Sequence, residues 1–599
     1  MSPASYETVE TDVLVLGAGG AGLRGAIAAA ESGARVLVVC KSLLGKAHTV
    51  MAEGGVAAAL HNVAYQDTWE VHFADTMKGG KLINDWRMAE IHAKESPERV
   101  LELERWGAVF DRTWQGRIHQ RPFGAHTYPR LAHIGDRTGL ELLRTLQDRA
   151  VHTNGVDVHM EVTVFKLLKT DGRITGALAY RRSDGSLILY RCAALLLASG
   201  GAGKMYRVTS NSWESTGDGA MLAFDAGAEL QDMEMVQFHP TGMIWPPGVR
   251  GILVTEGVRG EGGILRNGKG ERFMFDPKYT PPAYRGRYAE TEEEAHRWLE
   301  DKDNNRPPPE LLPRDVTSRA IYREVLAGNG TEHGGAYLDV TQRGADFVKR
   351  KLPSMYEQFR ALGDVDITRE PMEVGPTIHY TMGGVRAEPE TGATTRAGLF
   401  AAGEVACGVH GANRLGGNAL CDILVFGKRA GEAAARCAQS TAHGAIDEAT
   451  VREEAESLLA PFESPGTENP YLLTQELQAV MQEGAMIART EEDLSKRLDR
   501  VLGLQERAKN LHVEGSRLYN PGWHTARDIR VMLKLSEIIV RCALERRESR
   551  GAQWRTDYPD PDPEWAKRNL IATRDGEGIR ITTRPVPELP PELAALFKD

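Results

Sequence analysis

Short apolar runs alternate with an alanine-rich segment at the start of the chain, in the order strand, helix, strand. Thr11–Leu16 is a run of β-branched residues and leucine that predicts a buried strand of a parallel sheet. The alanine-rich stretch after it predicts a helix that ends near Ser32, where Gly33 is a typical helix stop. Arg35–Val39 then predicts a second strand, which completes a βαβ pattern.

Six residues with GxGxxG spacing join the first strand to the helix. A strand, a glycine turn and a helix N-terminus favour a pyrophosphate, because bare backbone N–H groups and the helix dipole both attract an anion. The acidic residue that usually binds the adenosine ribose after the second strand is absent, and Cys40 and Lys41 stand there instead. We predict a dinucleotide cradle made by Gly17, Ala18, Gly19, Gly20, Ala21 and Gly22.

Further elements are predicted in the middle of the chain. Val162–Leu168 and Ile174–Arg181 flank an Asp-Gly turn and predict two neighbouring strands. Ala193–Ser199 predicts another buried strand. Ala220–Ala226 predicts a helix that opens at a tight turn, where Asp218 could either cap the helix or bind a ribose or ribityl hydroxyl.

The pattern changes twice more toward the C-terminus. From about Pro240 to Gly363 the chain is richer in proline, glycine and charge, which predicts an α+β domain inserted into the nucleotide-binding fold. Residues 447–545 are mostly helical in pattern, with a capping box that begins at Thr490 and apolar positions that recur at helical spacing. Leu570–Arg584 predicts a hairpin in a small C-terminal unit. The fold class is therefore α/β, with an inserted domain and a helical domain.

Length and composition narrow the class of protein. A chain of 599 residues is too long for one core, and its 41% hydrophobic and 26% charged residues are ordinary for a globular protein. The net charge of −10 argues against a nucleic-acid partner. The six cysteines are scattered without a CxxC, so we predict no metal site. The N-terminus does not resemble a signal peptide, and no apolar run approaches the roughly 20 residues that span a bilayer.

Several histidines and arginines stand in glycine-dense segments, where charged side chains are poor candidates for surface decoration. Each could be structural when it is taken alone. His48 lies in the segment Gly45–Gly55 (GKAHTVMAEGG) and could be an ordinary loop histidine. The other segments are Gln237-Phe-His239-Pro-Thr-Gly, Thr255-Glu256-Gly-Val-Arg259-Gly-Glu-Gly-Gly, Arg314-Asp315, Thr377-Ile-His379-Tyr-Thr-Met-Gly-Gly and His410-Gly-Ala-Asn-Arg414-Leu-Gly-Gly-Asn418.

These segments, in this order, resemble the flavoprotein subunit of succinate dehydrogenase, in the family shared with fumarate reductase, over essentially the whole chain. The motifs AHTV, QFHPTG, TEGVRGEGG, RDV, HYTMGG, GLFAAGE and GANRLGGN all fall in the family's order. The resemblance implies a Rossmann-like FAD-binding domain with an inserted capping domain. The implied domains are residues 1–240 and 364–445 for FAD binding, 241–363 for the cap, 446–545 for the helical domain and 546–599 for the C-terminal domain.

The resemblance also implies how the cofactor is held. His48 would carry a covalent bond to FAD, and Glu404 would bind the ribityl chain. The backbone of Ala419 and Leu420 would complete the site. The remaining cofactor-binding residues by this resemblance are Lys41, Ser42, Thr49, Gly54, Gly55 and Asp218, together with the GxGxxG residues.

The same resemblance assigns the residues that bind and convert a four-carbon dicarboxylate. Guanidinium is the best partner for a carboxylate, so Arg414 would bind one end with His379, while His239 and Thr255 bind the other. Arg314 would transfer the proton, with Glu256 and Arg259 as the relay. Arginine is an awkward base because its pKa lies far above neutral, so this role depends on sharing the proton with Glu256.

The resemblance favours succinate oxidation at the cytoplasmic face of the cell membrane. The partners that it implies are a quinone-binding membrane anchor and an iron–sulfur subunit. A physiological fumarate reductase, an L-aspartate oxidase and a non-catalytic flavin scaffold are the alternatives. Three positions depart from the usual pattern. Glu53 is more common in fumarate reducers, Ala419 replaces a serine, and Gln553 replaces a histidine.

Overall fold

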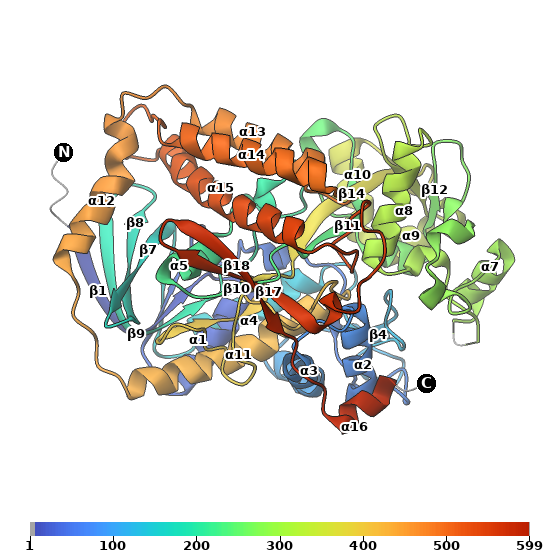
Figure 1. Ribbon diagram of the computed structural model, residues 1–599. Helices are drawn as coiled ribbons and strands as arrows, with labels where there is room; N and C mark the ends of the chain where they lie inside the picture. The colour runs from blue at the N-terminus through green and yellow to red at the C-terminus, as the bar shows by residue number, and fades with distance from the viewer. Residues whose placement is uncertain (1–5, 303, 598–599) are drawn as a thin grey trace.

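The computed structural model describes residues 6–302 and 304–597, and its largest sheet, with seven strands, lies at the left of Figure 1. The strand order is β6-β2-β1-β9-β8-β7, and β16 also pairs with β9. The strands β6, β2, β1, β9 and β16 are mutually parallel, whereas β7 and β8 pair antiparallel. These strands are β1 (Tyr6–Leu16), β2 (Val36–Val39), β6 (Val156–His159), β7 (Val162–Thr170), β8 (Arg173–Arg181), β9 (Leu187–Leu197) and β16 (Leu399–Ala401).

The two helices that pack together against this sheet come from opposite ends of the nucleotide-binding fold. They are α1 (Gly20–Glu31) and α11 (Asn418–Gln439). They approach so closely that a Cβ at Gly431 would lie 2.1 Å from the carbonyl oxygen of Gly25. The alanine-rich pattern predicts a helix over Gly427–Gln439, but α11 begins nine residues earlier, at Asn418. Its first turn therefore reaches the edge of the sheet where the glycine turn after β1 also lies.

The chain between β2 and β6 forms three further helices and a small sheet. The helices are α2 (Trp69–Gly79), α3 (Trp86–Arg105) and α4 (Thr138–Val151). The small sheet has the order β3-β5-β4, with β3 at Val56–Ala57, β4 at Gln120–Arg121 and β5 at Leu131–Ala132.

The predicted inserted α+β region has its own sheet and its own core. The sheet order is β11-β14-β13-β12, with β11 (Val236–Met243), β12 (Ile264–Arg266), β13 (Ala336–Asp339) and β14 (Met372–Thr381). The helices around it are α6 (Glu256–Gly260), α7 (Glu292–Glu300), α8 (Arg314–Leu326), α9 (Ala345–Lys351) and α10 (Pro353–Gly363), seen in green at the right of Figure 1. Because β11 and β14 pair along their length, the segments that enter and leave this region lie side by side.

Four long helices follow, and three of them lie side by side at the top of Figure 1. The four are α12 (Glu448–Glu463), α13 (Pro470–Gly484), α14 (Glu491–Ala508) and α15 (Pro521–Glu545). Thr490 caps α14 as predicted, since its hydroxyl accepts from the backbone N–H of Asp493 at 3.0 Å. Leu477 and Leu494, from the two predicted apolar stripes, are fully buried.

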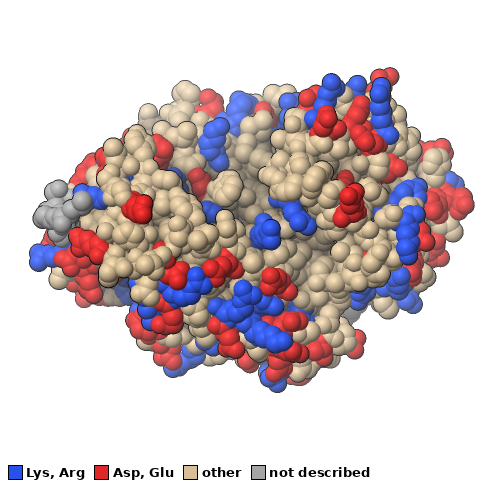
Figure 2. Space-filling view, turned by 90° about the horizontal axis from the view of Figure 1, so that it is seen from above, with Lys and Arg blue, Asp and Glu red and all other residues tan. Residues whose placement is uncertain are grey.

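The C-terminal segment joins the rest of the molecule at two places. The predicted hairpin is confirmed as β17 (Arg568–Asp575) and β18 (Gly578–Pro585), and β17 also pairs with β10 (Leu230–Gln231), which in turn pairs with β15 (Gly384–Val385). Short helix α16 (Pro591–Ala594) then packs Leu593 on α2 and α3. Over the described residues, none of the helices combines the length and apolar character needed to cross a membrane. Acidic and basic side chains lie interspersed, mainly around the edge of the face in Figure 2.

Candidate active site

One cavity brings together nearly all the residues that the sequence predicts for the site. It extends from the glycine turn after β1 to the strands β11 and β14 of the inserted region. The predicted residues that line it are Gly17, Ala18, Gly19, Gly20, Ala21, Lys41, Ser42, His48, Thr49, Gly54, Gly55, Asp218, His239, Thr255, Glu256, Arg314, His379, Glu404, Arg414, Ala419 and Leu420. Gly22 and Arg259 are not part of the lining.

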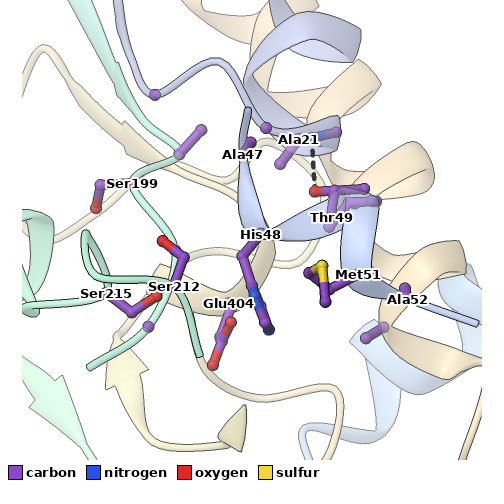
Figure 3. Close-up of a pocket in the computed structure, with 18 of the residues that line it drawn as sticks. Ala21, Ala47, His48, Thr49, Met51, Ala52, Ser199, Ser212, Ser215 and Glu404 are labelled. Atoms are coloured by element: carbon purple, nitrogen blue, oxygen red, sulfur yellow. Dashed lines mark hydrogen bonds between the residues drawn. The ribbon is translucent and has the colours of Figure 1, made fainter. Parts of the chain in front are cut away.

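The glycine turn has the form that a bound pyrophosphate needs. Gly17 adopts a φ of +115°, and a Cβ there would lie 2.3 Å from the carbonyl oxygen of Ala198. Gly22 supports the turn from behind, because a Cβ at that position would lie 1.9 Å from the carbonyl oxygen of Gly17. Thr49 closes one side, where its hydroxyl accepts from the N–H of Gly20 at 3.1 Å (Figure 3). The N-terminus of α1 therefore points into an open cradle, which fits the pyrophosphate of FAD.

Lys41 follows β2 at the place where an acidic residue usually binds the adenosine ribose. It belongs to a cluster of paired charges. Lys41 Nζ donates to Asp218 Oδ2 and Asp528 Oδ1, both at 2.9 Å, and to Thr216 Oγ1 at 3.0 Å. Arg527 also pairs with Asp218. Burial alone would lower the pKa of Lys41, but the two carboxylates raise it above its usual value. We call Lys41, Thr216, Asp218, Arg527 and Asp528 the Lys41 cluster.

The Lys41 cluster shows that Asp218 is not a helix cap, and it contains residues that sequence reasoning missed. Asp218 is the first residue of α5 (Asp218–Ala226), and its carboxylate contacts Lys41 and Arg527 instead of capping the helix. Burial would raise the pKa of Asp218, but Arg527 and Lys41 hold it well below its usual range. Arg527 and Asp528 come from α15 in the helical region, where no sequence motif signals a role near the cofactor.

His48 points into the cavity from a single helical turn, His48–Met51 (Figure 3). In the part of the chain that the structure describes, its Nδ1 has no hydrogen-bond partner. Burial, followed by the Arg414 guanidinium, lowers the pKa of His48 to about 4. The imidazole is therefore neutral at physiological pH and has a ring nitrogen available for reaction.

Two further elements complete the cofactor side of the cavity. Glu404 accepts from the backbone N–H of Thr381 at 3.0 Å, and burial raises its pKa to about 7. A Cβ at Gly201 would lie 2.2 Å from the Glu404 carboxylate, so the glycine makes room for this side chain. Ala419 and Leu420 lie in the first turn of α11, where no side chain caps the helix. The positive end of a long helix dipole thus faces the cavity.

At the other end of the cavity, cationic and neutral donors surround a space without a balancing carboxylate. The Arg414 guanidinium stacks on the Tyr380 ring at 4.3 Å from its centroid. Among the described residues no carboxylate pairs with Arg414, and its buried Nε has no hydrogen-bond partner. Burial and then the charge of Arg314 lower the pKa of Arg414. This buried cation suits a carboxylate ligand.

The two predicted substrate histidines face each other near this arginine. The rings of His239 and His379 lie 5.2 Å apart between centroids. His239 contacts the backbone of Thr241, and His379 Nδ1 lies 2.9 Å from the Ser210 hydroxyl. Burial, then nearby guanidinium groups, lowers the pKa of both histidines well below the usual value, so both are neutral at physiological pH.

A chain of buried ionic groups leads away from the same space. Arg314 Nε donates to Glu256 Oε2 at 2.9 Å, and Arg259 Nη2 lies 3.7 Å from the same oxygen. Burial would raise the pKa of Glu256, but Arg314 and Arg259 lower it. Arg259 is fully buried and donates to the backbone oxygen of Glu310, so it is not itself in contact with solvent.

Gln237 joins the two halves of this end of the cavity. Its Oε1 accepts from Arg314 Nη1 at 3.3 Å, and its Nε2 donates to the carbonyl oxygen of Arg414 at 2.8 Å. The motif QFHPTG contains Gln237 and the motif HYTMGG contains Tyr380, but the pattern alone gives neither residue a role. Glu53, one of the departures from the family pattern, lines the cavity, and burial raises its pKa well above the usual value.

Gln553, another departure, lies away from the cavity. It is fully buried, and its Nε2 donates to the carbonyl oxygens of Ala543 at 2.9 Å and Arg546 at 3.2 Å. Its side-chain oxygen accepts from Arg489. These contacts hold the segment after α15 in place and do not reach the cofactor cradle.

Comparison with known proteins gives matches over nearly the whole chain. Residues 12–420 match an FAD binding domain, and residues 474–591 match the fumarate reductase flavoprotein C-terminal domain. One chain of a fumarate reductase (CoM/CoB) from Methanothermobacter marburgensis is 43% identical, across 95% of this chain and 98% of that protein. The succinate dehydrogenase flavoprotein subunit of Rickettsia conorii is 36% identical, across 96% of this chain and 95% of that protein.

A solved structure agrees with these relatives. Mycobacterium smegmatis Sdh1 in complex with UQ1 superposes with a TM-score of 0.84 and 49% sequence identity, across 97% of this chain and 95% of that chain. The chain therefore belongs to the succinate dehydrogenase/fumarate reductase flavoprotein family of FAD-dependent oxidoreductases.

Proposed function

We propose that this protein is the flavoprotein subunit of a succinate dehydrogenase, which oxidises succinate to fumarate. The observation that carries the proposal is the buried, unpaired Arg414 with the neutral pair His239 and His379, facing the ion chain that begins at Arg314. A dicarboxylate supplies the two negative charges that this space lacks.

Each residue at this end has a defined task. Arg414 and His379 bind one carboxylate, while His239 and Thr255 bind the other, which fixes the central C–C bond. Bound FAD supplies a hydride acceptor. Arg314 takes up the proton that leaves the other carbon as it gives its own Nε proton to Glu256, which accepts from it at 2.9 Å, and Arg259 is the next group. The two hydrogens of succinate are thus divided between a hydride path and a proton path.

We further propose that His48 holds the FAD covalently through its free ring nitrogen. A neutral imidazole without a hydrogen-bond partner on Nδ1 is a competent nucleophile. Replacing a C–H bond of the flavin methyl group by a C–N bond releases two electrons and a proton, so an acceptor such as fumarate or dioxygen must take up the electrons.

The electrons need an exit, and we propose that the partners are a quinone-binding membrane anchor and an iron–sulfur subunit. The protein would then lie peripherally at the cytoplasmic face of the cell membrane. The similarity to Mycobacterium smegmatis Sdh1, solved in complex with UQ1, supports this assembly.

Physiological fumarate reduction is the second candidate, and Glu53 favours it. This carboxyl group lines the cavity, and burial raises its pKa well above the usual value. The 43% identical relative is also a fumarate reductase. L-aspartate oxidase and a non-catalytic flavin scaffold are weaker candidates, because His48 and the complete set of substrate-binding residues favour neither.

The first experiment is acid precipitation of the purified protein, with flavin fluorescence read in pellet and supernatant. Fluorescence in the pellet that is lost in His48→Ala, but kept in the control His152→Ala at an exposed position, supports the covalent bond. Dye reduction with succinate, dye reduction with aspartate, and fumarate-dependent oxidation of reduced viologen then separate the candidates. Turnover with aspartate alone contradicts the proposed function, and faster fumarate reduction than succinate oxidation supports the second candidate.

A further inference from the structure

Three histidines outside the proposed site hold the turn that joins Arg414 to α11. His126 Nε2 lies 2.7 Å from the carbonyl oxygen of Gly416. His72 Nε2, from α2, lies 3.0 Å from Asn418 Oδ1. His92 Nε2, from α3, lies 3.1 Å from the carbonyl oxygen of the same asparagine. Three separate segments therefore converge on Gly416–Asn418.

The partners of these rings define the tautomers. Carbonyl oxygens only accept hydrogen bonds, so His126 and His92 must donate from a protonated Nε2. The Asn418 amide nitrogen donates to Thr76 Oγ1 at 3.0 Å, which leaves its Oδ1 as the acceptor for His72. The Nδ1 atoms of all three rings find no hydrogen-bond partner within residues 6–302 and 304–597.

All three rings are also uncharged. Burial, followed by the charge of Arg130, lowers the pKa of His72 well below its usual value and that of His126 to about 4. Burial lowers the pKa of His92 to about 4 as well. Neutral donors hold the turn without adding positive charge beside Arg414, which a protonated ring would repel.

The turn that they hold fixes two groups that face the cavity. On one side is Arg414, whose carbonyl oxygen is held by Gln237 at 2.8 Å. On the other side is the first turn of α11, where Ala419 and Leu420 line the cavity and no side chain caps the helix. Gly417, between them, adopts a φ of +86°, a conformation that glycine reaches without steric cost.

We propose that His72, His92 and His126 are positioning residues that fix the α11 N-terminus and Arg414 against the bound cofactor and thereby raise its reduction potential. This inference rests on the proposed function only in that the cavity holds a flavin. A flavin gains negative charge on reduction, and a preorganised helix N-terminus and a guanidinium stabilise such charge. A looser turn places both groups less well and lowers the potential.

The test is a redox titration of the flavin-loaded, full-length protein, followed by flavin absorbance. His72→Leu and His92→Leu remove the donors, whereas His72→Gln and His92→Gln keep an N–H group of similar reach. The control is His152→Ala, at an exposed position. We expect each Leu variant to shift the ratio of oxidised to reduced flavin at least about tenfold toward the oxidised form, or about 30 mV for a two-electron couple. We expect the Gln variants to recover most of that shift.

Two results would overturn the proposal. One is a Leu variant that retains flavin at the potential of the unmodified protein. The other is a Gln variant that behaves like its Leu counterpart, which would indicate that ring packing and not hydrogen bonding matters. Where a buried variant does not fold, His126→Leu is the second test, because this ring is only half-buried. An unchanged potential in His126→Leu, with flavin bound, would likewise contradict the inference.

This test and the proposed function fail in different ways. If the unmodified protein binds flavin but does not oxidise succinate, the proposed function is wrong, while the potential of each variant can still be measured. If succinate is oxidised and the potentials do not change, only the positioning role is wrong.

Discussion

The two ends of the cavity treat buried charge in opposite ways. In the Lys41 cluster, each buried charge has a partner, since Lys41 bonds to two carboxylates at 2.9 Å and Arg527 pairs with Asp218. We call the other end, which contains Arg414, His239 and His379, the reaction end. There Arg414 is a buried cation for which the described residues supply no carboxylate. The histidines beside it, His239 and His379, are neutral.

This difference follows from how long each ligand stays. A cofactor that stays bound needs a shaped site, and a network with satisfied charges is rigid without it. A dianion that enters and leaves needs a site whose charge is incomplete until it binds. An unpaired buried cation destabilises the empty protein, and the ligand that pairs with it recovers that free energy as binding.

Arg414→Met should have the largest effect on activity. Removal of one partner of a buried charge pair costs about 2–5 kcal/mol, so kcat/KM for succinate should fall about 30- to 5,000-fold. Because Arg414 has no partner in the empty site, the same change should leave the free energy of unfolding of the succinate-free protein unchanged or raised. Steady-state dye reduction and urea unfolding without succinate measure the two quantities. Arg369→Met, at a position 85% exposed, is the control.

A large loss of stability in Arg414→Met would break the comparison, because it would show that the reaction end has internal partners after all. Succinate offers a further check on the same variant. It should raise the unfolding midpoint of the unmodified protein by mass action and should no longer do so in Arg414→Met.

Lys41→Met should show the reverse pattern. It leaves Asp218 and Asp528 beside a single remaining cation, and loss of one partner from a buried ion network costs about 3–5 kcal/mol. The urea midpoint should fall accordingly, while kcat for the flavin-loaded fraction should change little. Lys496→Met is the matched control, since its pair with Glu492 is exposed and should contribute little to stability. Equal stability of Lys41→Met and Lys496→Met would contradict the paired character of the cluster.

The sequence predicts the residues of the reaction end better than those of the Lys41 cluster, and the reason is physical. His48, His239 and Arg414 stand in sequence segments that contain glycines, where local pattern and family order mark them. The contact between Lys41 and Asp528 joins residues 487 positions apart, and in sequence Asp528 is one charged residue in a long helix. Only the packing of the helical region on the nucleotide-binding fold brings the two together.

The start of α11 shows the same limit. The alanine-rich stretch predicts a helix only from Gly427, and no element is predicted for residues 419–426, which follow the motif GANRLGGN. The structure extends the helix to Asn418, where hydrogen bonds from distant segments hold the first turn. These tertiary contacts have no local signature, and neither do the roles of His72 and His92.

Acidification should weaken the reaction end before the Lys41 cluster. His239 and His379 have lowered pKa values, so below about pH 6.5 the unfolded chain binds protons that the folded chain does not. Each therefore lowers the stability by up to about 1.4 kcal/mol per pH unit of acidification. Asp218 also has a lowered pKa, but as an acid it keeps its contribution until the pH falls to about 4. Urea midpoints at about pH 7 and about pH 5.5 should differ less in the double variant His239→Gln/His379→Gln than in the unmodified protein. If the urea midpoint changes equally with pH in both proteins, the lowered pKa values of His239 and His379 are contradicted.

Ala419→Ser should have the smallest effect, and it separates a departure inside the cavity from one outside it. Ala419 lines the cavity at the first turn of α11, so an added hydroxyl would lie at the cavity wall. One neutral hydrogen bond contributes about 1 kcal/mol, so the flavin absorbance should shift while kcat/KM changes less than about fivefold.

Gln553→His should leave the flavin spectrum unchanged, because Gln553 contacts Ala543, Arg546 and Arg489 and not the cavity. It should instead lower the urea midpoint, since an imidazole cannot make all three of these contacts. A spectral change in Gln553→His would show that the segment after α15 is coupled to the flavin, and the two departures would then belong to one site.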